Sequence, residues 1–281
     1  MREGGMLRKS SWLMAPCLAY MLVMYVTPAL IMLYSPFQNG VGSGIASLGE
    51  ALVEPSYQRV MMTTFRTALV VTVVAVLLGY PTAYYLSRLP SEKVGKYMLL
   101  IMFPLWTSLL VRTYAWIALL QDAGVINSTL MSTNLISNPV RLLYNSGSVA
   151  IGMVQILLPY AIVTMYSVMV GIKPRLSQTA QVLGASPVRA FWHVFFPLSL
   201  PGLSAACLLL FIMGLGFFVT PALLGGRRDM MVGTLIQQQV VLLGDWNSAS
   251  LLSIMLLAAT IILLFVYSRF ARLENLVPAS S

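Results

Sequence analysis

Charged side chains are scarce in this chain of 281 residues. Only 9% of the residues are Asp, Glu, Lys or Arg, whereas 58% are hydrophobic, and a soluble domain carries about 25% charged residues. A soluble fold of this length could not bury so much apolar surface. The composition therefore excludes an ordinary soluble protein and predicts a protein that crosses a membrane several times.

Residues that build catalytic and metal sites are also few. His193 is the only histidine, which excludes most His-built metal sites, and Cys17 and Cys207 lie in apolar runs without the spacing of a metal or redox site. The chain contains no Gly-x-x-x-x-Gly-Lys phosphate loop and no Gly-x-Ser-x-Gly elbow. The eight acidic residues lie mostly in loops. We therefore expect no catalysis, and no metal or cofactor bound by this chain.

Long apolar runs dominate what is present, and a membrane-crossing helix needs about 20 mostly apolar residues. The sequence predicts an all-α membrane protein with a single domain over 1–281. Six candidate spans lie at about 12–34, 64–86, 97–120, 148–170, 200–224 and 248–268.

Two of these regions carry further expectations. The third run contains Pro104 and Arg112, so we expect its membrane part to end near Arg112 and Thr113–Gln121 to continue as an outer helix. The first outer loop, 35–57, contains "NGVGSG" and is predicted to be loosely packed.

The basic residues predict the orientation, because cytoplasmic loops of membrane proteins carry an excess of Lys and Arg. The net charge of +9 comes from short clusters between apolar runs, so topology explains it better than nucleic-acid binding. The richer set is Arg2, Arg8, Lys9, Arg88, Lys93, Lys96, Lys173, Arg175, Arg189, Arg269 and Arg272; the poorer set is Arg59, Arg66, Arg112, Arg141, Arg227 and Arg228. We expect the richer set and both termini to be cytoplasmic.

One half-polar stretch, "QTAQVLGASPVRAFWHVFFPLSLPG" (178–202), interrupts the apolar chain in the cytoplasmic loop 171–199 between spans four and five. Ser186 is a natural helix N-cap and Pro187 suits the first helical position. Pro197 and Pro201 are expected to break the chain before span five. Two short helices joined by a small-residue elbow could receive a partner protein, or could lie on the membrane as an interfacial helix.

This stretch resembles the "EAA" loop of ABC importer permeases. Ala180, Gly184, Val194, Phe196 and Pro197 stand in register with that motif, between the fourth and fifth spans as in the family. The resemblance implies the six-helix type I ABC importer permease fold, in which this loop is a cytoplasmic coupling helix.

The resemblance also implies partners. They are a second homologous permease, an ABC ATPase dimer that binds ATP and Mg, a periplasmic substrate-binding protein and membrane lipid, and the location is the bacterial inner membrane. The residues that the resemblance assigns to ATPase coupling are Gln178, Ala180, Gly184, Ala185, Ser186, Pro187 and Arg189. Gln178 stands where the family usually has Glu, so a charged contact is not expected there.

Four segments extend the resemblance to the spermidine/putrescine branch, first permease type: "LLGYPTAYYLSRLP", "FPLWTSLLVRTYAW", "ILLPYAIVTMYSVM" and the loop itself. It implies half of a translocation pathway for a small amine, working by alternating access. Another amino-acid-like or anionic solute is the alternative within this family. An autonomous channel or ion-coupled carrier is the alternative from another class.

A pathway for ammonium groups should offer carboxylates and aromatic faces. The residues of that kind are Trp106, Tyr114, Trp116, Asp122, Tyr160, Asp245 and Trp246, although the aromatic belt at membrane interfaces also explains Trp and Tyr. Arg112 would repel an amine unless it pairs, for example with Asp122. Gly214 and Gly216 with Pro221 indicate helix packing or gating flexibility, and Phe217 with Phe218 could form part of a gate, packing being the alternative.

Overall fold

A computed structural model describes residues 4–38 and 40–274, and every regular element in these two ranges is helical. Arg2, which entered the comparison of basic residues, lies outside the described residues. Six helices are long and apolar enough to cross a membrane: Ala19–Phe37, Pro55–Ser87, Leu109–Ser132, Ser146–Met169, Pro187–Leu215 and Trp246–Arg269. The predicted all-α, six-span fold is confirmed.

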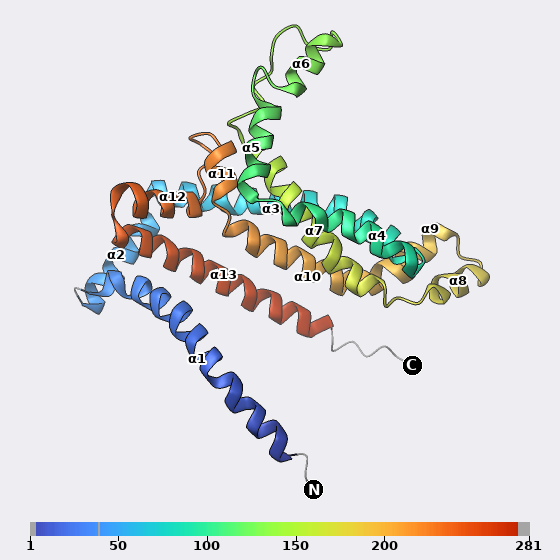
Figure 1. Ribbon diagram of the computed structural model, residues 1–281, viewed down its shortest axis with the longest axis horizontal. Coiled ribbons are helices and arrows are strands. Elements are labelled where there is room, and N and C mark those ends of the chain that lie inside the picture. Colours follow the sequence, from blue (N-terminus) through green and yellow to red (C-terminus); the bar gives the residue numbers. More distant parts are fainter. Residues whose placement is uncertain (1–3, 39, 275–281) are drawn as a thin grey trace. The chain divides into compact units, whose positions relative to one another are not determined.

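The chain forms two compact units. The smaller unit takes the chain up to Gln58 and Ile236–Ile262; the larger takes Arg59–Leu235 and the chain from Leu263. The elements of the smaller unit are α1 (Gly4–Tyr34), η1 (Ser35–Phe37), α2 (Val41–Val53), the π-helical turn η4 (Gln239–Leu243) and the first part of α13 (Trp246–Glu274) (Figure 1).

The first outer loop differs from the sequence prediction. Most of the "NGVGSG" piece lies at the start of α2, which begins at Val41, and α3 begins directly after it at Pro55. Buried Gly44 packs on the Phe37 ring. A loosely packed loop was therefore the wrong prediction, because small residues here allow a close contact between η1 and α2.

The larger unit is built around α7, with α10 packed along it (Figure 1). Its buried core takes side chains from α3, α7, α10 and α11, including Val71, Met153, Leu157, Leu210 and Leu224. The elements are α3 (Pro55–Ser87), α4 (Ser91–Met102), η2 (Phe103–Trp106), α5 (Leu109–Leu120), α6 (Val125–Ser132), α7 (Ser146–Met169), α8 (Pro174–Val182), α9 (Pro187–Ala190), the π-helical turn η3 (Phe191–Phe195), α10 (Phe196–Leu215), α11 (Val219–Leu224) and α12 (Val232–Gln238).

Small residues bring the core helices close together. A Cβ placed on Gly79 of α3 would lie 3.2 Å from the Ala161 Cβ of α7, and one on Gly214 of α10 would lie 3.2 Å from the Ala68 Cβ of α3. Side chains at these positions would push the backbones apart, as at other membrane helix crossings. The predicted packing role of Gly214 is confirmed.

Two apolar runs that the sequence presents as single spans are divided. The run 97–120 is interrupted between η2 and α5, where Thr107 and Ser108 adopt extended backbone conformations. Pro104 causes the tight 3₁₀ turn before this break, because it has no N–H to continue an α-helix. The run 200–224 is interrupted at Gly216, which ends α10, and α11 resumes at Val219.

The prediction that Pro197 and Pro201 break the chain before span five is wrong. The helix continues from Pro187 to Leu215 through both prolines. The π-helical turn η3 widens the helix immediately before Pro197, and such a turn accommodates the hydrogen bond that proline cannot make. The segment from Pro187 onward and span five therefore form one continuous helical rod.

Candidate coupling segment and translocation residues

The segment between α7 and α10 consists of α8, a tight elbow, α9 and the π-helical turn η3. The elbow begins where Gly184 takes φ +93°, and the Ala185 N–H then donates to the Ala180 carbonyl at 3.0 Å. A residue in the left-handed region is the usual end of a helix, and glycine adopts it without a steric penalty. The sequence places a glycine where the chain must reverse.

The second helix of the segment starts as predicted. The Ser186 side chain accepts a hydrogen bond from the Arg189 N–H at 3.3 Å, and Pro187 takes the first helical position. One turn later, His193 Nδ1 lies 3.1 Å from the Arg189 carbonyl oxygen. The predicted cap is confirmed, and His193 is exposed on the helix surface.

Exposed apolar side chains flank the elbow. Val182 is 87% exposed, Leu183 82% and Val188 67%. Built on Gly184, a Cβ would meet no atom within 4 Å. Large apolar groups exposed together mark a contact surface when they lie outside the lipid. Sequence reasoning named Gly184 but missed these neighbours, although their alternation with small residues was visible.

The predicted coupling residues all lie on this segment. Gln178, Gly184, Ser186, Pro187 and Arg189 are exposed, and Ala180 and Ala185 are partly exposed. All are therefore within reach of a partner, and their coupling role stays a prediction.

An aromatic cluster ties the end of the segment to α3. The Phe195 ring is 1% exposed and lies 4.7 Å, centroid to centroid, from the Tyr84 ring in an edge-on arrangement. The Arg88 guanidinium carbon lies 4.7 Å from the Phe195 centroid and 5.4 Å from the Tyr84 centroid. Edge-on rings and a cation over a ring face are both favourable. The end of the segment thus packs against α3.

A hydrogen bond adds a second tie one turn along. The Ser199 hydroxyl donates to the Phe196 carbonyl at 2.8 Å, so its oxygen accepts from the Tyr80 hydroxyl at 2.7 Å. Tyr80 lies on α3 and Ser199 on α10, and Ser199 is buried. This bond links α3 directly to α10, the helix into which α9 continues.

Most of the residues predicted to line a substrate pathway lie at the surface of the larger unit. Within the larger unit, Trp106, Tyr114 and Asp122 are exposed, Phe218 is exposed between α10 and α11, and Tyr160 lies on α7 at the edge of exposure. The part played by these residues in transport stays a prediction.

Two of the remaining predicted aromatics pack into the core. Trp116 on α5 packs against the core, and its Nε1–H donates to Gln155 Oε1 of α7 at 3.0 Å. Phe217 also packs against the core. The gate suggested for Phe217 and Phe218 is untested.

Asp245 and Trp246 belong to the smaller unit, at the start of α13. The Asp245 carboxylate accepts a hydrogen bond from the Ser248 N–H at 3.0 Å, so it caps the helix. Hydrogen bonds from the Ser248 side chain and then its backbone hold the pKa of Asp245 below its ordinary value. Trp246 is exposed. Asp245 thus has a structural role that the sequence reading did not anticipate.

Arg112 lies in the first turn of α5, and its Nε and Nη1 atoms are buried without a hydrogen-bond partner among the described residues. Asp122 follows the end of α5 ten residues later, roughly 15 Å along a helix. The pairing of Arg112 with Asp122 considered from the sequence is therefore wrong, because the two lie at opposite ends of one helix.

A polar cavity of the smaller unit contains carboxylates that the sequence reading overlooked. The cavity, of about 410 Å³, is lined by Glu50 and Glu54, one turn apart on and just after α2, and by Tyr57 and Asn247. Its groups are hydrogen-bond acceptors and an aromatic face, which suit an ammonium group. The four-residue spacing of the two glutamates was the available signal.

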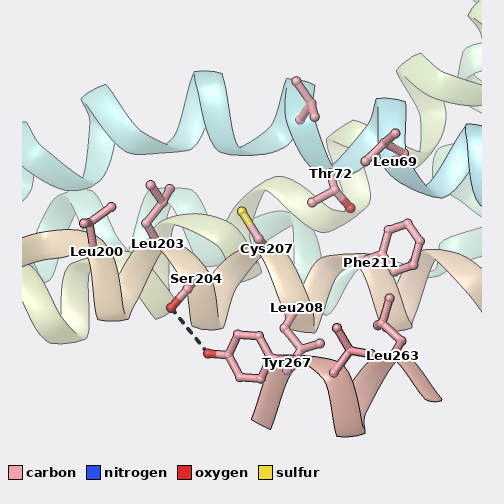
Figure 2. A pocket seen from close by; sticks show the side chains of 12 residues that line it. Leu69, Thr72, Leu200, Leu203, Ser204, Cys207, Leu208, Phe211, Leu263 and Tyr267 are labelled. Atoms are coloured by element: carbon pink, nitrogen blue, oxygen red, sulfur yellow. Dashed lines mark hydrogen bonds between the residues drawn. The ribbon is translucent and has the colours of Figure 1, made fainter. Parts of the chain in front are cut away.

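The larger unit also carries an apolar groove of about 600 Å³ between α3, α10 and the end of α13. Figure 2 shows Leu, Phe and Cys side chains along it, with the Ser204 hydroxyl pointing to the Tyr267 hydroxyl at one end, 3.3 Å away. In a membrane protein such a surface suits acyl chains or another apolar helix.

Comparison with known proteins decides the family. No family model matches the chain. The spermidine/putrescine transport system permease protein PotB of Escherichia coli (strain K12) is 33% identical over 224 residues, which cover 80% of this chain and 82% of PotB. The chain belongs to the PotB family of ABC transporter permeases. The inner membrane ABC transporter permease protein YdcU of the same strain is 28% identical over 234 residues, or 79% of this chain and 73% of YdcU.

Solved structures agree on the fold. A chain of the bacterial alginate ABC transporter, crystallised with an alginate pentasaccharide-bound periplasmic protein, superposes with a TM-score of 0.71 at 16% identity, covering 97% of this chain and 98% of that chain. At this identity the likeness concerns the fold alone. The predicted ABC importer permease fold is confirmed, and this PotB-family chain is a multi-pass transport permease of the inner membrane.

Proposed function

We propose that this chain is a permease subunit of an ATP-driven importer for a small polyamine such as putrescine or spermidine. The observation that carries this is the 33% identity with PotB, the permease of a spermidine/putrescine transport system, over most of both chains. The chain forms half of the translocation pathway, and a second homologous permease forms the other half.

The energy source lies outside this chain. ATP and Mg bind to an ABC ATPase dimer, which contacts the elbow around Gly184. The exposed Val182, Leu183 and Val188 support this contact, because apolar groups beside a small elbow suit a groove on a partner. The ties of Tyr84 and Tyr80 to Phe195 and Ser199 then carry the motion into α3 and α10.

The transport cycle is alternating access. A loaded extracytoplasmic binding protein docks on the outer side, ATP closes the ATPase dimer, and the coupled helices open the pathway outward. Hydrolysis restores the inward-open state. A ligand that binds one state better shifts the population toward it, so docking and ATP act on the same equilibrium.

The orientation places the elbow in the cytoplasm and the loop around Arg227 outside, with both termini inside. The asymmetric distribution of Lys and Arg supports this. With Cys17 and Cys207 replaced by serine, an impermeant thiol reagent added to intact cells should label Arg227→Cys and should not label Gln178→Cys. The opposite labelling pattern would contradict the orientation.

Reconstitution tests the function. The chain with its sister permease, ATPase and binding protein should import radiolabelled putrescine or spermidine into proteoliposomes only when ATP is enclosed with the ATPase. Leaving out the ATPase or the binding protein should abolish uptake. Uptake by this chain alone would show an autonomous channel or carrier instead, and uptake of a carboxylated solute in place of amines would correct the substrate.

A further inference from the structure

A small cavity on the larger unit is lined by charged side chains that have no part in the proposed coupling to the ATPase. It has a volume of about 270 Å³ and lies between the first half of α3, the first turn of α7 and the loop that follows α11. Arg66 of α3 and Arg228 of the loop, both exposed, line it together with Gly147 of α7. Sequence reasoning used both arginines only to orient the chain.

The carboxylate in this cavity is already engaged. Asp229 accepts hydrogen bonds from the Ser146 hydroxyl and, at 3.1 Å, from the Gly226 N–H. Within the described part of the chain neither Arg66 nor Arg228 forms an ion pair. Asp229 therefore holds the loop in place. Among the described residues, both guanidinium groups are left without an anionic partner.

The loop that carries Arg228 is fixed at both ends. The Ser148 hydroxyl donates to the Leu224 carbonyl at 2.8 Å before the loop, and the Val232 N–H donates to the Thr64 hydroxyl at 2.8 Å after it. Both bonds are buried. The Arg228 backbone is thus held between α7 and α3, so little ordering remains to be done when a ligand binds.

The chemistry of the cavity suits an oxyanion. Ser146 and Gly147 are the first two residues of α7, whose N–H groups have no acceptor within the helix. The positive end of that helix and the two guanidinium groups all attract an anion, and the single Asp229 carboxylate offsets only part of this charge. Arginine binds a carboxylate through two parallel hydrogen bonds, and two arginines can approach one carboxylate from both sides.

The size of the cavity further limits which ligands can fit. Small-molecule sites usually have volumes of about 300–1,000 Å³, and 270 Å³ lies below that range. One acidic side chain fits such a space better than a whole solute. Under the proposed orientation Arg66, Arg228 and neighbouring Arg227 all face the side from which the binding protein arrives, so the charges complement an acidic docking surface.

We propose that the cavity between Arg66 and Arg228 receives a carboxylate side chain of the extracytoplasmic binding protein. The inference rests on the proposed function, since it needs a binding protein. The contact guides docking and fixes its register, and it contributes more to association at low salt than at high salt.

The test uses the complete complex in nanodiscs with its purified binding protein. Arg66→Gln and Arg228→Gln should each raise the binding-protein concentration that half-saturates ATPase stimulation by about tenfold at low ionic strength. The increase should shrink as salt is added. ATPase activity without binding protein should stay at the wild-type level, because neither residue lies near the coupling segment in sequence or in its contacts.

Arg227→Gln is the matched control, since Arg227 is exposed beside Arg228 and does not line the cavity; its half-saturation should stay within about twofold. Arg228→Lys keeps the positive charge, so its half-saturating concentration of binding protein should rise less than that of Arg228→Gln. Unchanged half-saturation in both glutamine variants, or an equal loss in Arg227→Gln, overturns the inference. So does a raised solute requirement with normal docking, which would assign the cavity to a carboxylated solute. A wild-type complex that its binding protein does not stimulate would instead refute the proposed function.

Discussion

Gly184→Arg is expected to reduce transport to background while the protein remains in the membrane. Nothing within the chain lies within 4 Å of a Cβ at this position, so the substitution leaves the chain's own packing intact. An arginine would put bulk and charge on the surface proposed to meet the ATPase. Uptake into proteoliposomes and stimulated ATPase activity should both be lost, and membrane insertion should be unchanged by immunoblot.

Two controls separate backbone strain from bulk. Because φ is +93° at Gly184, any other L residue is strained by about 1–2 kcal/mol. Gly184→Asn is tolerated best in this region and should retain most transport. Gly95→Arg changes another exposed glycine, on α4, with open space around it, and should be silent. Normal transport by Gly184→Arg would remove the docking argument, and loss in Gly95→Arg would make the effect non-specific.

Phe195→Ala is expected to separate ATP hydrolysis from transport and to destabilise the chain. It removes a buried ring that contacts both Tyr84 and Arg88, and truncation of a buried Phe costs about 3 kcal/mol. The segment would then move without carrying α3. Thermal melting in detergent should shift downward, and the number of ATP molecules hydrolysed per solute imported should rise.

A milder change and an exposed phenylalanine serve as controls. Arg88→Gln removes the cation from the ring faces, which costs about 1 kcal/mol. It should raise the number of ATP molecules hydrolysed per solute, as Phe195→Ala does, with a smaller loss of stability. Phe265→Ala truncates a ring that is 70% exposed on α13 and should alter neither property. A Phe195→Ala protein of lowered stability but normal ATP-to-solute ratio would show that the cluster only stabilises the fold.

Composition and local pattern were sufficient for the class of protein and for the two short helices and turn around Gly184. Long apolar runs indicate membrane spans, because a helix needs about 20 mostly apolar residues to cross the hydrocarbon core. The Ser186 cap and the Gly184 turn were equally readable, since each depends on a few adjacent residues. These features were predicted and are found in the structure.

Whether a helix continues through a proline was less predictable, because it depends on the hydrogen-bond pattern of the neighbouring turns. Pro104 led to an interruption, whereas Pro197 and Pro201 did not, since a π-helical turn precedes Pro197. The same residue type thus has opposite outcomes. Its local propensity does not decide which one occurs.

Residues far apart in the chain meet only after packing. Tyr84 and Phe195 are separated by more than a hundred positions, as are Arg66 and Arg228, and no short pattern joins them. Their proximity follows from the packing of α3 against α7 and α10, which close approaches at small residues permit. Hydrophobicity along the chain thus sufficed to predict a six-span membrane protein with a polar elbow. The packing of Phe195 on α3 and the meeting of Arg66 and Arg228 at one cavity emerged only from the folded chain, because contacts between distant segments depend on shape complementarity that a linear pattern does not encode.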